Sequence, residues 1–181
     1  MNAAVTTSAG LALGVATTAA LFDWQRGEIP NWLTLPPIAG APFAYGLAFG
    51  IEYALHSLAA AFLSALVPYI LFRRGAMGGG DVKLFGALGA VTGFDLLVGI
   101  EIQLAALVVA MLVACGTLAW KGILLGTLGN ALAQALNPLL PGRLRQEPCD
   151  ALSTRIRMGG AIFVATGFFA APHLALAWSE L

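Results

Sequence analysis

The chain has 181 residues, of which 59% are hydrophobic and only 10% are charged. Soluble domains carry about 25% charged residues, so this composition excludes an ordinary water-soluble domain and indicates a protein that is solvated by lipid. The formal net charge is zero, which leaves no general basic surface for binding nucleic acid.

Six apolar stretches predict membrane-spanning helices, because a bilayer core needs about 20 apolar residues per helix. In chain order they are Ala4–Phe22, Leu33–Ile51, Ser57–Phe72, Val82–Gly99, Ile102–Trp120 and Met158–Trp178. No Lys or Arg precedes the first stretch, so we interpret it as a retained span and not as a signal peptide. The prediction is an all-α, polytopic membrane helix bundle that forms a single domain over residues 1–181.

The stretch Gly122–Leu140 is apolar enough to suggest a seventh span. Three of its amides recur at i, i+4 and i+7 and form a polar stripe on one helical face, namely Asn130, Gln134 and Asn137. Pro138 then ends the helix. We therefore predict an amphipathic helix that lies at the cytoplasmic interface, with a seventh span as the alternative.

The cations predict the orientation of the bundle, because Lys and Arg concentrate in cytoplasmic loops. If the N-terminus lies outside the cytoplasm, six spans place all the Lys and Arg residues in cytoplasmic segments: Arg26, Arg73, Arg74, Lys83, Lys121, Arg143, Arg145, Arg155 and Arg157. The outer segments then carry acids and no cation: Glu52, Asp95, Glu101 and Glu180. The opposite orientation would put every cation outside.

A run of three glycines precedes Asp81 where the fourth span is expected to begin. Glycine permits close approach of the backbone to other groups, so Gly78–Gly80 could deliver the carboxylate of Asp81 into a crowded helical interface. A flexible loop with a helix-capping Asp explains the same pattern about equally well. Further glycines follow Asp81 at helical spacing, and we interpret them as a face for close helix packing: Gly86, Gly89 and Gly93.

A second acid, Asp23, follows the first span, and Pro30 and Asn31 form a turn into the second span. The orientation from the cations puts Asp23 and Asp81 at the same cytoplasmic edge. Two carboxylates in a partly dry site cannot both ionise easily, so the pair shares a proton. Such a pair suits peptide hydrolysis without a metal or cofactor, because one acid accepts a proton from water while the other donates to the scissile carbonyl.

Gly78-Gly79-Gly80-Asp81 fits the G-x-G-D signature of intramembrane aspartyl proteases. The chain also resembles the type IV prepilin peptidases at two further places. Val82-Lys83-Leu84 continue the signature, and Asp23, upstream of it, is followed by Pro30-Asn31. The resemblance implies a six-span bundle in the bacterial inner membrane, with catalytic Asp23 and Asp81 at the cytoplasmic ends of spans one and four. We further predict that five residues shape the site or bind the substrate: Gly78, Gly80, Lys83, Pro30 and Asn31. For Lys83, a position facing the phosphate headgroups explains the charge at least as well.

The substrate implied by this resemblance is a membrane-inserted prepilin with a short basic leader. Bifunctional members of the family carry paired C-x-x-C motifs, which are linked to methylation of the trimmed pilin. This chain contains only Cys115 and Cys149, so it resembles the short form that serves Flp/Tad-type pili. Near the C-terminus, Arg157-Met-Gly-Gly-Ala161 stands where many relatives have a Pro-aromatic-Gly-Pro stretch. The sequence predicts no oligomeric state.

Two other classes of function stay open at this point. Acids within a membrane also mark proton-coupled transporters, and the glycines alone would suit a non-catalytic membrane scaffold. A transporter needs polar groups along a path across the whole bilayer. Asp23 and Asp81 lie instead at one predicted edge, and the middles of the spans are overwhelmingly apolar.

Overall fold

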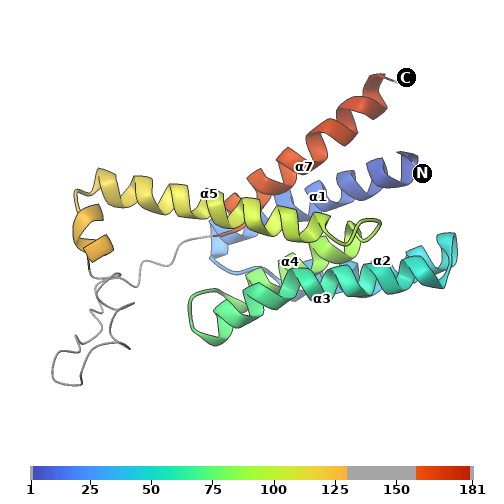
Figure 1. Cartoon of the computed structure of the whole chain (residues 1–181), viewed down its shortest axis with the longest axis horizontal. Coiled ribbons are helices and arrows are strands. Elements are labelled where there is room, and N and C mark those ends of the chain that lie inside the picture. The colour runs from blue at the N-terminus through green and yellow to red at the C-terminus, as the bar shows by residue number, and fades with distance from the viewer. Residues whose placement is uncertain (1, 130–157, 180–181) are drawn as a thin grey trace. The chain divides into compact units, whose positions relative to one another are not determined.

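The computed structural model describes residues 2–129 and 158–179, and every regular element among these residues is helical. The labelled helices are α1 (Asn2–Arg26), α2 (Asn31–Phe49), α3 (Ile51–Arg73), α4 (Gly79–Val91), α5 (Val98–Trp120) and α7 (Gly159–Ser179) (Figure 1). A further helical segment, residues 124–129, follows α5. The predicted all-α class is confirmed.

The contacts divide the chain into two compact units, Met1–Val109 with Arg157–Leu181 and Ala110–Ile156. The first unit holds α1 to α4, the beginning of α5, and α7. The second unit holds the rest of α5, a turn at Gly122 with a φ of 70°, and the helical residues 124–129. The expectation of a single domain over the whole chain stays a prediction, and the site described below belongs to the first unit.

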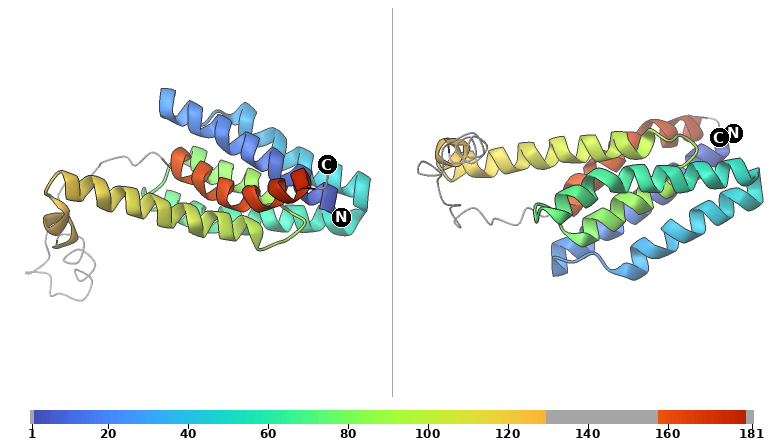
Figure 2. Two further views of the ribbon diagram at one scale, coloured as in Figure 1. Left: turned by 90° about the horizontal axis from the view of Figure 1, so that it is seen from above. Right: turned by 60° about the horizontal axis from the view of Figure 1, so that its bottom comes forward.

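Within the first unit, α1 packs along α7, and α2, α3 and α4 pack on one another (Figures 1 and 2). Helices α1 and α7 are antiparallel, because Asp23 lies beside Gly159 at one end and Gly10 lies beside Leu174 at the other. Four alanines of α1 recur every three or four residues and are fully buried: Ala9, Ala12, Ala16 and Ala19. Helix α1 also contacts α4, which joins the two groups of helices.

Glycines of α4 allow it to approach α3 closely. A Cβ atom at Gly89 would lie 2.5 Å from both the Ala60 carbonyl oxygen and the Ser64 Oγ. Gly93, in the turn after α4, lies equally close to Ser57. The predicted close contact is confirmed at Gly89 and Gly93, where any side chain would force the segments apart, but not at Gly86, where a Cβ would lie at an ordinary 3.6 Å from the Cβ of Ala65.

The expected span Val82–Gly99 is wrong in its extent, because α4 ends at Val91. The hydroxyl of Tyr45 donates to the Val91 carbonyl, and the hydroxyl of Ser57 donates to the Ala90 carbonyl at 2.7 Å. Asp95 then accepts the Leu97 N–H at 2.9 Å, an arrangement that favours a turn. Helix α5 consequently begins at Val98 and not at Ile102.

Three helical segments are long and apolar enough to cross a membrane: Ala4–Arg26, Ile51–Arg73 and Val98–Trp120. They fall within α1, α3 and α5, whereas α2, α4 and α7 do not meet the same standard among the described residues. Large apolar side chains nevertheless point outward on several helices, such as Leu47 of α2 at 75% exposure and Phe168 of α7 at 77%. These surfaces suit lipid. Most of the predicted amphipathic helix Gly122–Leu140 lies outside the described residues.

Candidate active site

Asp23 lies in the last turn of α1 and is buried, with 7% of its surface exposed. The helix ends just beyond it, because Gly27 adopts a φ of 69° and donates its N–H to the Asp23 carbonyl at 2.9 Å. The Phe22 ring packs edge-on against Trp32 of α2 at 5.5 Å, and the Arg26 guanidinium lies 5.3 Å from the same Phe22 ring. These contacts hold the end of α1 against the beginning of α2.

Asp81 is the third residue of α4, which begins at Gly79 after the N-cap residue Gly78. The Asp81 carboxylate accepts a hydrogen bond from the backbone N–H of Gly78. An acid at the third helical position that reaches back to the N-cap N–H is half of a capping box. Asp81 is thus fixed by its own helix, and a Cβ at Gly78 would lie only 3.0 Å from its Oδ2 atom.

The two other glycines of the run allow neighbouring segments to approach α4. A Cβ at Gly80 would lie 3.1 Å from the Cβ of Ile29, which belongs to the loop between α1 and α2. A Cβ at Gly79 would lie 3.4 Å from the ring of Phe72, near the end of α3. The loop that follows Asp23 therefore packs directly on the residue before Asp81.

The carboxylates of Asp23 and Asp81 interact electrostatically. Asp81 precedes the predicted span and is half-buried. Its pKa is raised from 3.8 to about 6, first by burial and then by the negative charge of Asp23, and the Gly78 N–H offsets only part of this rise. The structure thus brings the two acids that the sequence singled out into one partly dry site, from the end of α1 and the beginning of α4.

Two further residues from the sequence prediction contact each other at the edge of this site. The Lys83 Nζ donates to the Asn31 Oδ1 at 2.8 Å, and both side chains are exposed. Pro30 is the N-cap of α2, and its carbonyl accepts the Leu33 N–H at 3.1 Å. The Lys83–Asn31 bond therefore joins the beginning of α4 to the beginning of α2.

Sequence reasoning missed Gly159, the first residue of α7. Its backbone N–H donates to the Asp23 Oδ2 at 2.9 Å in a buried hydrogen bond. A Cβ at Gly159 would lie 2.8 Å from both the Cβ and the Oδ2 of Asp23. The only available signal was the Gly159-Gly160 pair at the start of an apolar stretch, which repeats the pattern of glycines before Asp81.

Asp95, Glu101 and the two histidines do not join this site. Asp95 lies in the turn between α4 and α5, and Glu101 lies in the first turn of α5. The His56 ring packs against Tyr53 near the beginning of α3. The His173 ring packs against Phe169 near the end of α7. Within residues 2–129 and 158–179, no group of three or more His, Cys, Asp or Glu residues is placed to hold a metal ion.

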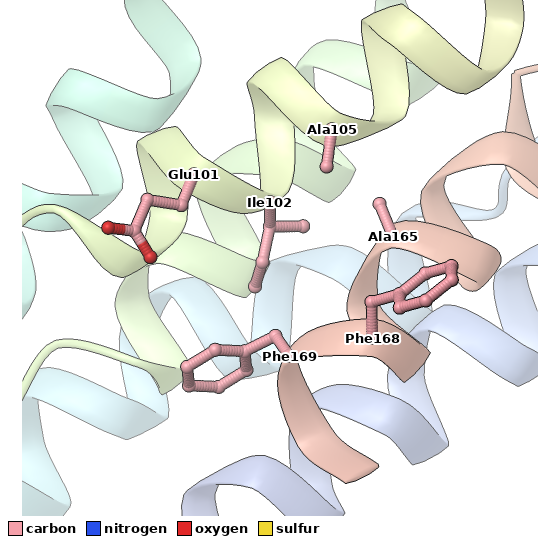
Figure 3. Close-up of a pocket in the computed structure, with 6 residues that line it drawn as sticks. All are labelled: Glu101, Ile102, Ala105, Ala165, Phe168 and Phe169. Carbon is pink, nitrogen blue, oxygen red and sulfur yellow. The ribbon is translucent and has the colours of Figure 1, made fainter. Parts of the chain in front are cut away.

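A separate pocket opens between α5 and α7. Its lining is mostly apolar and comprises Glu101, Ile102, Ala105, Ala165, Phe168 and Phe169 (Figure 3). Neither Asp23 nor Asp81 contributes to it. The pocket is therefore separate from the site of the two carboxylates.

The chain matches the model of the Type IV leader peptidase family over residues 10–139. This match includes Asp23, the glycine run and Asp81, and it ends before Gly159. No curated protein and no solved structure matches the chain.

Proposed function

Because the chain belongs to the type IV leader peptidase family, we propose that it is an aspartyl endopeptidase of the bacterial inner membrane. In this proposal it removes the basic leader from Flp-type prepilins at the cytoplasmic face, with Asp23 and Asp81 as the catalytic pair. The observation that carries the proposal is that buried Asp23, at the end of α1, and half-buried Asp81, at the beginning of α4, share one partly dry site in which the loop after α1 packs on Gly80.

The coupled acids supply the chemistry that amide hydrolysis needs. One acid is ionised and accepts a proton from a water molecule while the water oxygen bonds to the scissile carbonyl carbon. The other acid is protonated and donates its proton to the carbonyl oxygen. As the tetrahedral intermediate collapses and the C–N bond breaks, the leaving nitrogen takes the proton that the first acid had accepted. A hydroxyl of the intermediate returns its proton to the second acid as the C=O bond re-forms.

The apolar outer surface of the helices supports a membrane location. We propose that the six labelled helices form six passes across the membrane, α4 together with the turn that follows it because α4 alone has 13 residues, and that the N-terminus is outside the cytoplasm. The end of α1 and the beginnings of α2, α4 and α7 then form the cytoplasmic edge, where Arg26, Arg73, Arg74 and Lys83 also lie. A substrate helix in the bilayer would present its leader at this edge.

In this proposal Gly78 and Gly80 allow close contacts around Asp81. Each lacks a Cβ where one would press on Asp81 Oδ2 or on Ile29. Lys83 and Asn31 join α4 to α2 beside the acids, and Pro30 begins α2. We propose that these five residues shape the site, with Asp23 and Asp81 as the groups that touch the reacting atoms.

The test is to incubate the purified protein, in detergent micelles or nanodiscs, with a full-length prepilin and to determine the masses of the products. We expect a shortened pilin and a free leader. Asp23→Asn and Asp81→Asn should each lower the cleavage rate by about 10²–10⁴-fold while circular dichroism shows an unchanged helical content. Asp95→Asn, in the turn beyond α4, is the matched control and should cleave normally.

Absence of any product with the wild-type protein would contradict the peptidase proposal. Normal cleavage by both Asn variants would contradict the catalytic pair. Proton flux into proteoliposomes that requires Asp23 and Asp81, without any peptide product, would instead support a proton-coupled transporter.

A further inference from the structure

The carboxylates of the proposed pair have different surroundings. Asp23 is buried and receives the N–H of Gly159 from α7, a helix distant in sequence by 136 residues. Asp81 is half-buried and receives the N–H of Gly78, which belongs to its own helix cap. Among residues 2–129 and 158–179, Asp23 is thus bound by a separate helix, whereas Asp81 is bound by its own helix cap.

Gly159 is well placed to bind a negative charge. It is the first residue of α7, and the regular helix begins there, because the Met158 carbonyl accepts the Ile162 N–H at 2.9 Å. The first N–H groups of a helix have no partner within the helix. They also lie at the positive end of the helix dipole, so a carboxylate that accepts such a bond is stabilised in its ionised form.

The contact also depends on the absence of a side chain. A Cβ atom at Gly159 would lie 2.8 Å from the Cβ and the Oδ2 of Asp23, closer than real Cβ atoms approach other heavy atoms. Gly160, the next residue, has nothing within 4 Å of its Cβ position. The bundle therefore fits closely around Asp23 at one of these two glycines and leaves open space at the other.

We propose that the backbone N–H of Gly159 holds the Asp23 carboxylate in place as the base of the pair, with Asp81 as the acid. This inference rests on the proposed function. Asp23 Oδ2 accepts the hydrogen bond from the Gly159 N–H. Oδ1 is therefore the atom that accepts the proton of the attacking water. Asp81 gives its proton to the carbonyl oxygen. The proton on Asp23 then passes to the leaving nitrogen as the C–N bond breaks. Gly159 is a positioning residue and does not touch the substrate.

Matched alanine variants test this role through the kinetics of prepilin cleavage. Gly159→Ala keeps the N–H but places a methyl group against Asp23, so the carboxylate must move. A displacement of about 1 Å in a catalytic group can cost about 100-fold, so we expect kcat to fall about 10- to 100-fold with little change in KM. Gly160→Ala should keep the kcat of the wild type. Rates are normalised to the folded fraction, measured by circular dichroism.

A second measurement leaves Gly159 intact, so it holds even if Gly159→Ala does not fold. The protein is labelled with ¹⁵N-glycine, and the amide resonance of Gly159 is compared in the wild type and in Asp23→Asn. Loss of the carboxylate charge should shift the Gly159 amide proton upfield and leave that of Gly160 nearly unchanged.

Each outcome is decisive. If the wild type cleaves and Asp23→Asn does not, but Gly159→Ala cleaves like Gly160→Ala, the positioning role is wrong and the proposed function stands. An unmoved Gly159 resonance in Asp23→Asn would overturn the role in the same way. If the wild type does not cleave at all, the proposed function fails and the role of Gly159 in it fails too.

Discussion

The two ends of the helix bundle are held together by different physical means. At one end, which we call the acidic end, Asp23, Asp81 and Gly159 lie where α1, α4 and α7 meet. At the other end, which we call the aromatic end, four rings of α2, α3 and the turn after α4 pack together: Tyr45, Phe49, Tyr53 and Phe94.

The aromatic contacts at one end of the bundle offset the cost of the two acids at the other end. At the aromatic end the centroid of Phe94 lies 4.6 Å from Tyr45, 5.1 Å from Phe49 and 5.7 Å from Tyr53. Such ring pairs each contribute about 0.5–1.5 kcal/mol beyond their burial. At the acidic end the glycines admit close contacts, but two acids interact unfavourably. We infer that the aromatic end stabilises the fold, whereas the acidic end lowers stability in favour of chemistry.

The largest effect on stability is expected from Asp81→Asn, and it depends on pH. The pKa of Asp81 is raised from 3.8 to about 6 in the folded protein. The folded state thus favours the protonated acid, and this contribution to stability is complete below about pH 4 and is lost as the pH rises towards about 6. Asn removes the penalty of the charge, so at neutral pH the variant should be more stable by up to about 3 kcal/mol, at 1.36 kcal/mol per pKa unit.

Chemical unfolding of both proteins in the same detergent, at about pH 4 and about pH 7.5, measures this effect. The variant should gain stability only at the higher pH. An equal difference in unfolding free energy between the two proteins at both pH values would show that burial and Asp23 do not raise the pKa of Asp81. The acidic end would then not lower the stability of the fold.

A smaller loss of stability is expected at the aromatic end from Phe94→Ala. The change removes three ring contacts of a half-buried side chain and should cost about 2 kcal/mol of unfolding free energy. Phe43→Ala, at an outward-facing ring with 69% exposure, is the matched control and should cost much less in detergent. The cleavage rate of the folded fraction should stay unchanged for Phe94→Ala, and a large loss of kcat would contradict the separation of the two ends.

The smallest effect is expected from Lys83→Met, which removes the exposed hydrogen bond to Asn31 at the acidic end. Exposed polar contacts of this kind contribute about 0–1 kcal/mol. The free energy of unfolding should therefore fall by only about a few tenths of a kcal/mol. The corresponding variant Asn31→Ala should reproduce any change in cleavage if Lys83 acts by joining α4 to α2. A large change in the cleavage rate with Lys83→Met but not with Asn31→Ala would instead indicate that the Lys83 charge acts on the substrate leader.

The sequence predicted the acidic end better than it predicted the helix boundaries. Apolar runs indicated the helices, and the cations predicted one common edge for Asp23 and Asp81. The break after Val91 was missed because the apolar Phe94, Leu96 and Leu97 extend the apolar stretch past the turn residues Thr92, Gly93 and Asp95. It depends instead on long-range bonds from Tyr45 and Ser57 to the last carbonyls of α4.

Gly159 could not be predicted for a different physical reason. Its contribution is a backbone N–H, which every residue except proline carries, and its partner is distant in sequence. Composition and periodicity depend on side chains, so they cannot predict which helix end contacts which carboxylate. Ile29 was missed in the same way, because its contact with Gly80 depends on the packing of the loop.

A double-mutant cycle tests whether Asp23 and Asp81 act as one catalytic unit. Prepilin cleavage is measured by product mass over time for the wild type, Asp23→Asn, Asp81→Asn and the double variant. Because residues that act as a unit have strongly non-additive effects, we expect the double variant to be no slower than either single variant. If the two losses multiply instead, the acids work independently and the shared site is wrong.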